Sequence, residues 1–189
     1  MKKTKFTALL MLLIIVSTFL TGCVSVSGTY AKLKYGAKMY SQCDEWILPS
    51  FFDKNKISGV AYKNPDYVEG VDDYSEKYYT DYDAPRTRAF IVNDEETYNE
   101  IFKENSLKVD FDKETVFVHI LSTTTATNIY VIDDIAVDSG KVSIYFIKRN
   151  FLSIFMDGTA PSPICLVVKM DKIDVDNVEF IKVEGSRIL

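Results

Sequence analysis

The sequence predicts an α+β fold with a mostly antiparallel β-sheet of about seven strands and one or two helices, preceded by an N-terminal leader. Three observations support this prediction. Short apolar or alternating segments recur through the second half of the chain, and this pattern is typical of strands. The segment 94–104 instead has apolar residues at helical spacing. A turn sequence at 138–141 joins two of the strand candidates, and this favours antiparallel neighbours.

The leader has the layout of a bacterial lipoprotein signal peptide. A basic start at 1–5 precedes an apolar run at 6–20, and the sequence Leu20-Thr21-Gly22-Cys23 follows. This last sequence resembles a lipobox, in which the chain is cleaved before the cysteine and the cysteine is acylated. A retained transmembrane helix is the alternative, but such a helix needs about 20 apolar residues and this run is shorter. We therefore expect residues 1–22 to be removed and Cys23 to carry lipid.

A lipid on Cys23, such as palmitate, would hold the protein on the cell membrane with its folded part on the extracytoplasmic face. Removal of the signal peptide leaves 167 residues. These include 19 basic and 27 acidic residues, which gives a net charge of −8. Nucleic-acid binding requires clustered Lys and Arg, so this charge argues against a nucleic-acid partner. The predicted partners are the membrane and a protein of the cell envelope.

The mature chain divides into a lipid-anchored tether at 23–36 and one domain at 37–189, because its length suits a single domain. Cys43 and Cys165 lie within the domain. Two readings of this pair stay open: a disulfide, which an extracytoplasmic location permits, and two separate buried thiols.

The first part of the domain is predicted to contain a helix and a strand. Apolar residues in 37–48 suit one helical face, and Pro49 would end that helix, although an extended reading also accounts for them. Phe51 and Phe52 are expected to lie in the core or in a lid. The segment 57–62 is predicted to be a strand.

Residues 64–85 are predicted to form a long exposed loop bracketed by Pro65 and Pro85. This segment contains seven acidic residues, one lysine and five tyrosines. Tyrosines suit contact with a partner, and they equally suit covering a sheet. The candidate binding residues are Tyr74, Tyr78, Tyr79 and Tyr82.

The same loop offers oxygen ligands for calcium at Asp72, Asp73 and Glu76. Their spacing does not match an EF-hand loop, and a solvated acidic loop accounts for them equally well. We predict no cofactor.

From residue 86 onward the pattern is clearer. Residues 88–92 are predicted to form a strand and 94–104 a helix, with Asn93 or Asp94 as N-cap. Counted from Asn93, Glu96 occupies the third helical position of a capping box. A turn is expected at 110–113.

Six further strands are predicted, and the first of them is almost continuously apolar, which favours a central position in the sheet. They span 115–121, 128–132, 134–137, 142–147, 164–170 and 178–183. A loop is expected over 151–162. In 142–147, Val142, Ile144 and Phe146 would share one face of the strand.

His119, the only histidine, lies in the most apolar predicted strand. No nucleophile motif accompanies it, so a hydrogen-bonded structural histidine is favoured over catalysis. A cell-envelope hydrolase that uses His119 remains an alternative, as does a calcium-dependent binding module.

The order of elements in the second half of the chain resembles the PrcB C-terminal-type domain of secreted and lipid-anchored bacterial proteins. The similarity rests on the helix at 96–102, the segment Val109-Asp110-Phe111-Asp112-Lys113-Glu114-Thr115-Val116 that leads into a strand, the hairpins, and the strand at 163–169. It covers residues 88–184, and residues 122–130 stand where that family has a glycine-rich segment. The resemblance implies an interaction module without catalysis, which agrees with the binding lipoprotein that the residues predict.

Overall fold

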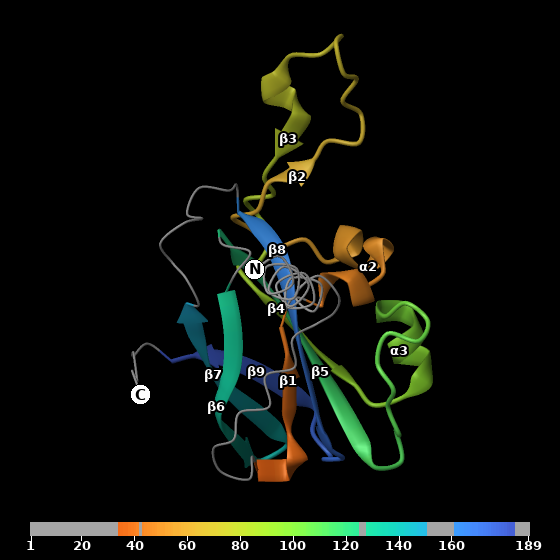
Figure 1. Cartoon of the computed structure of the whole chain (residues 1–189), viewed down its shortest axis with the longest axis vertical. Helices are drawn as coiled ribbons and strands as arrows, with labels where there is room; N and C mark the ends of the chain where they lie inside the picture. Colours follow the sequence, from red (N-terminus) through yellow and green to blue (C-terminus); the bar gives the residue numbers. More distant parts are fainter. Residues whose placement is uncertain (1–33, 42, 125–127, 151–160, 184–189) are drawn as a thin grey trace, which may run out of the picture.

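The computed structural model describes residues 34–41, 43–124, 128–150 and 161–183, and the predicted α+β class is confirmed. The described residues form nine strands in three sheets and two α-helices, and all strand pairs but one are antiparallel. Two of the sheets and both helices make up the body, and the third sheet lies at the base of a projection (Figure 1).

The first sheet has four antiparallel strands in the order β1-β8-β5-β4. Their bounds are Lys38–Tyr40 for β1, Ser162–Asp171 for β8, Glu114–Thr123 for β5 and Arg88–Val92 for β4. Strand β5 lies between β8 and β4, so the predicted central position of 115–121 is confirmed. Its side chains from Thr115 to Leu121 are all buried, because both faces of this sheet are covered.

The second sheet has the order β6-β7-β9, with bounds Asn128–Asp138, Lys141–Asn150 and Asn177–Lys182. Strands β6 and β7 form the predicted hairpin, and Ser139 and Gly140 at its turn have φ values of 48° and 77°. Positive φ at both positions suits the right-handed twist of a hairpin. Strand β9 pairs in parallel with β7. The prediction that Val142, Ile144 and Phe146 share one face of β7 is confirmed, and the structure shows that this face is buried.

The body has three layers, because the first sheet is covered by the second sheet on one face and by the helices on the other (Figure 1). The helices are α2, Pro49–Lys54, and α3, Glu95–Ile101. Phe117 and Leu166 belong to the core between the sheets, whereas Val116 and Val167 belong to the core beneath the helices. Alternate residues of β5 and β8 therefore serve different cores, as the two-residue period of a strand requires.

The helix predicted over 37–48 is wrong. This segment contains the edge strand β1 and a short 3-10 helix, η2, Asp44–Trp46, and Pro49 begins the next helix instead of ending one. Proline is well suited to the first helical position, where the amide that it lacks would have no partner. The alternative extended reading is the one that the structure supports for Lys38–Tyr40.

The strand predicted over 57–62 is also wrong, since only Tyr62 at its end is in a strand. Ile57 and Val60 are buried without a ladder partner of their own, in the core beneath the helices. Their apolarity reflects burial and not strand formation.

Two smaller corrections concern later elements. The strands predicted at 128–132 and 134–137 are one strand, β6, in which an irregularity between Ile132 and Asp134 shifts the register. The helix predicted over 94–104 is shorter, and its cap is Asp94, whose Oδ1 accepts a hydrogen bond of 2.7 Å from Thr97 N. Of the predicted loop at 151–162, residues 151–160 lie outside the described part of the chain, and Ser162 already belongs to β8.

The start of the described chain contacts the body. Residues Lys34–Gly36, which the sequence assigned to the tether, form the 3-10 helix η1. Lys34 Nζ lies 3.0 Å from Asp134 Oδ1 and donates to Ile135 O at 3.3 Å. The chain is therefore held against β6 before β1 begins.

Candidate functional site

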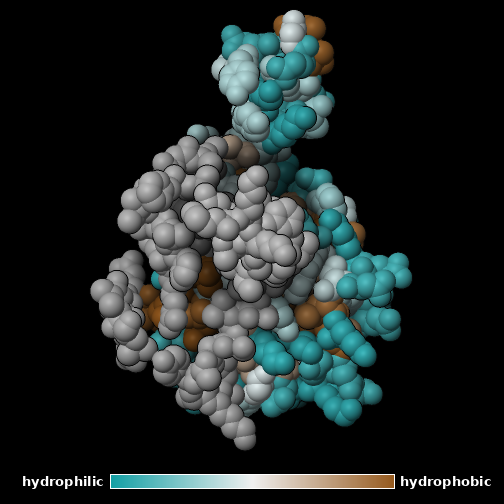
Figure 2. Space-filling model, viewed as in Figure 1, coloured by the Kyte–Doolittle hydropathy of each residue, from teal (hydrophilic) through white to brown (hydrophobic). Residues whose placement is uncertain are grey.

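The most prominent feature of the surface is a projection that we call the arm, residues 62–83. Strands β2, Tyr62–Lys63, and β3, Tyr78–Tyr79, pair at its base, and the 3-10 helix η3, Tyr74–Lys77, precedes β3. The arm stands clear of the body at the end opposite to η1 (Figure 1). Figure 2 shows hydrophobic atoms at its outer end, among mainly hydrophilic ones. Val71 is 78% exposed.

A lysine organises the outer part of the arm. Lys77 Nζ lies 5.1 Å from the ring centroid of Tyr74 and 5.5 Å from that of Tyr67, and it pairs with Glu69 Oε2 at 2.9 Å. The hydrogen bond to Glu69 raises the pKa of the Lys77 ammonium, which is therefore charged at neutral pH. These contacts give the arm a defined shape without a hydrophobic core of its own.

A second lysine, from the body, holds the base of the arm. The Lys56 ammonium donates to the Tyr79 hydroxyl and lies 4.9 Å from the centroid of the same ring. The hydroxyl of Tyr62 accepts a hydrogen bond of 2.8 Å from Ile57 N. The arm is thus tied to the body at its two strands.

The four candidate binding tyrosines all lie on the arm surface. Tyr82 is 85% exposed, Tyr74 69%, Tyr78 49% and Tyr79 36%. The sequence left two roles open for these tyrosines, contact with a partner and covering a sheet. In the structure they do not cover a sheet. Such exposed aromatic area suits contact with a partner, because a tyrosine loses little conformational entropy when it is held.

Two of the three candidate calcium ligands accept hydrogen bonds from within the arm. Asp72 Oδ2 accepts a hydrogen bond of 2.6 Å from Val68 N, and Asp73 Oδ1 accepts bonds of 2.8 Å and 2.7 Å from the amide and hydroxyl of Ser75. The bonds from Ser75 lower the pKa of Asp73. The backbone carbonyl of Glu76 accepts a bond from Asn64. Within the described ranges, no three Asp, Glu, His or Cys side chains gather as a metal site, so Asp72, Asp73 and Glu76 are not brought together as ligands.

His119 lies in the core between the two sheets and is 3% exposed. Its ring stacks on Phe180 at a centroid distance of 4.4 Å, and its Nδ1 lies 3.1 Å from the carbonyl oxygen of Arg88. Because a carbonyl only accepts, Nδ1 carries the proton in this contact. Burial lowers the pKa of the imidazole to about 4, so it is neutral at pH 7. The geometry is that of a structural histidine.

The two cysteines of the domain are neighbours in the core beneath the helices. Cys43 N donates to Cys165 O at 3.4 Å, and both side chains are fully buried. Asp44 next to them accepts a hydrogen bond of 2.7 Å from Cys165 N. Cys23, the predicted site of lipidation, lies outside the described residues.

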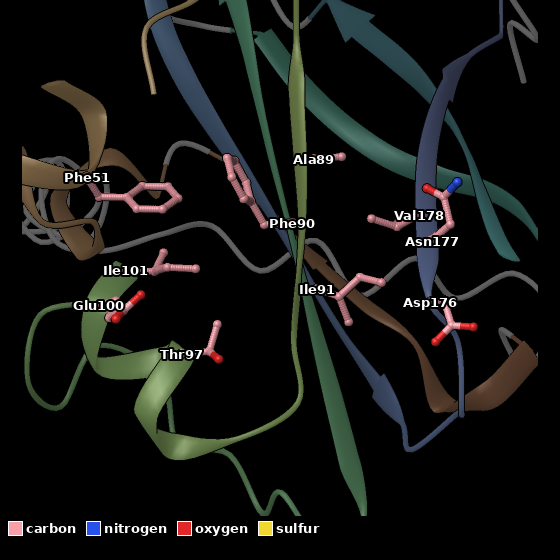
Figure 3. A pocket seen from close by; sticks show the side chains of 10 residues that line it. All are labelled: Phe51, Ala89, Phe90, Ile91, Thr97, Glu100, Ile101, Asp176, Asn177 and Val178. Atoms are coloured by element: carbon pink, nitrogen blue, oxygen red, sulfur yellow. The ribbon is translucent and has the colours of Figure 1, made fainter. Parts of the chain in front are cut away.

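A second surface feature, which the sequence did not indicate, is a groove of about 480 Å³ along strand β4 (Figure 3). We call it the β4 groove. Its floor is β4, one wall comes from the helices and the other from the start of β9. The lining residues are Ala89, Phe90 and Ile91 of β4, Phe51, Thr97, Glu100 and Ile101 of the helices, and Asp176, Asn177 and Val178.

The groove was missed because its residues carry no motif. The apolar strand 88–92 was predicted, but its position at the edge of the sheet depends on which strands pair with it. The composition of this strand could have indicated an edge that is open to pairing, since no Pro or Lys interrupts Ala89–Val92.

Within the described residues, no helix is both long enough and apolar enough to cross a bilayer. Comparisons with protein-family models, curated proteins and solved structures found no match to this chain.

Proposed function

We propose that this chain is a lipid-anchored binding protein of the extracytoplasmic face of the cell membrane, and that it acts by presenting the arm to a protein of the cell envelope. The observation that carries the proposal is the exposure of Tyr74, Tyr78 and Tyr82 on a segment that projects from the body. Large exposed aromatic side chains are enriched where proteins contact partners.

The position of the arm relative to the anchor supports this role. The described chain begins at η1, at the end of the body opposite to the arm (Figure 1). A lipid on Cys23 would tether that end to the membrane, so the arm would point away from the bilayer.

The charge of the arm indicates the chemistry of the partner. Residues 62–83 contain seven acidic residues against Lys63 and Lys77. Since Lys77 is already paired with Glu69, the arm presents a net negative field beside its apolar tip. A partner surface with basic residues around an apolar pocket would be complementary to it.

Photo-crosslinking in the native host tests the arm. A benzophenone amino acid placed at Tyr82 or Tyr74 is expected to give one recurrent adduct with an envelope protein, because these side chains would lie in the interface. The same amino acid at Val137, which is 38% exposed on β6 outside the arm, is the matched control. Adducts with the same pattern from all three positions would overturn the role of the arm.

Palmitate labelling tests the anchor separately. The wild-type protein is expected to incorporate labelled palmitate and to fractionate with membranes, because the lipobox-like sequence predicts Cys23 as the acylated residue. Cys23→Ala is expected to lose both the label and the membrane association. Cys43→Ala should retain them. Persistent labelling of Cys23→Ala would show that the anchor is elsewhere.

A further inference from the structure

The β4 groove has the edge of a sheet as its floor. Strand β4 is the last strand of its sheet, and among the described strands only β5 pairs with it. In an antiparallel pair, alternate residues of an edge strand direct their N–H and C=O groups away from the partner. The described residues 88–92 are mostly half-buried, so this edge is partly accessible at the groove.

The two faces of β4 have apolar walls. Phe90 points to the helical wall, where its ring lies 4.9 Å from that of Phe51, next to Ile101 (Figure 3). Ala89 and Ile91 point to the other side, towards Val178 at the start of β9. A segment paired with β4 would therefore place alternate side chains against apolar surface on both sides, as a strand does within a sandwich.

The rim of the groove is acidic on both walls. Glu100 of α3 and Asp176 before β9 are exposed lining residues, and none of the ten lining residues is basic. Lysine or arginine side chains of a bound segment would reach these carboxylates from an apolar groove floor.

We propose that the β4 groove binds an extended polypeptide segment with basic and apolar residues, which adds to β4 as a further strand. Such strand addition uses main-chain hydrogen bonds for affinity and alternate side-chain contacts for specificity. The new strand would lie about 5 Å from β4, the usual spacing between paired strands.

A single extended segment fits this site better than a second copy of the protein. Strand β4 lies between the helical wall and β9, so the β4 of another molecule would have to approach with its own two walls on either side. The acidic residues on both rims would also face their counterparts.

Binding of synthetic peptides to the full chain, purified in a non-ionic detergent, tests the proposal. A fluorescent decapeptide in which pairs of valines alternate with pairs of lysines carries both residue types on each face of a strand, and it is expected to bind, as measured by anisotropy at low salt. The same peptide with glutamate in place of lysine, and the lysine-valine peptide with proline at its central positions, are expected not to bind. Failure of the lysine-valine peptide to bind, or equal binding of all three, would overturn the proposal.

Two double variants test the acidic rim. Glu100→Gln with Asp176→Asn is expected to weaken binding of the lysine-valine peptide by about fivefold to tenfold, since two partly exposed ion pairs are lost. Glu96→Gln with Asp174→Asn removes the same charge from exposed positions on α3 and ahead of β9 that do not line the groove, and it should leave the affinity unchanged. Equal losses of affinity in both double variants would mean that only the net charge of the protein matters. That result would contradict the assigned site.

Hydrogen exchange measured by NMR tests the binding mode. Alternate amide protons of β4 are expected to exchange rapidly in the free protein and at least tenfold more slowly with the lysine-valine peptide bound. Slow exchange that appears instead in the arm would assign the peptide to the surface of the proposed function. Slow exchange of all β4 amides in the free protein, together with a dimeric mass in sedimentation, would show that a second copy occupies the edge.

Discussion

Phe117→Ala is expected to lower the free energy of unfolding by about 3–5 kcal/mol, the range seen for large aromatic truncations in cores. Phe117 is fully buried in the middle of β5, the strand with a partner on each side. Its side chain belongs to the core between the two sheets. Truncation would leave a cavity in the interface between the sheets. The loss is a large fraction of the stability of a domain of this size.

Urea denaturation followed by the fluorescence of Trp46, the only tryptophan, measures this effect. Trp46 lies beneath the helices, with its ring 5.4 Å from that of Tyr40, so it reports on unfolding from a different core. Phe117→Leu keeps most of the side-chain volume and is expected to cost only about 1 kcal/mol. A loss below 1 kcal/mol in Phe117→Ala would mean that the two sheets are not held together as the structure shows.

The free energy of unfolding is expected to fall by about 3 kcal/mol between pH 7 and pH 4 because of His119 alone. Burial lowers the pKa of this imidazole from 6.5 to about 4 in the folded protein. Below pH 6.5 the unfolded chain therefore takes up a proton that the folded protein does not accept. The contribution is fully present above pH 6.5 and is lost as the pH falls towards 4.

His119→Gln isolates this contribution, because a glutamine amide can donate to the Arg88 carbonyl but does not titrate. Carboxylates whose pKa is lowered in the fold, such as Asp73 and Asp94, destabilise both proteins in acid and cancel in the comparison. The variant should be less stable than the wild type at pH 7, since it lacks the ring stacked on Phe180. That difference should shrink by about 3 kcal/mol at pH 4. A constant difference across this range would place the histidine in contact with solvent.

The sequence was most informative after residue 86, where apolar segments alternate with clear turn residues. Strand 88–92 was predicted with its observed bounds, and the hairpin turn at 138–141 was predicted from its residues. In these places the alternation of side chains agrees with the faces that the sheets bury. The local preference and the tertiary structure then point to the same conformation.

The sequence was least informative before residue 88, where elements are short. A three-residue edge strand at Lys38–Tyr40 has too few residues to show a period. The buried Ile57 looks like part of a strand, although it lies in irregular chain under the helices. Burial imposes apolarity on any conformation, so a short apolar run does not identify its own secondary structure.

The arm and the β4 groove also differ in how far the sequence could predict them. The composition of 64–85 indicated an exposed segment, because so many acidic residues cannot be buried together. It did not indicate that β2 and β3 would pair and turn the segment into a projecting arm. The β4 groove depends on residues far apart in the chain, Phe51, Glu100 and Asp176 among them, which no local pattern connects.

The order of residues by itself determined the α+β class, the strong strands, the acidic exposed segment and the prediction of an acylated Cys23, because each follows from local composition or spacing. Only the tertiary structure decided which strand became an edge, which faces met in two separate cores, and where His119 and the acidic side chains came to lie. Strand pairing and burial depend on contacts between distant segments and on the free energy of the whole domain. No single segment therefore encodes them.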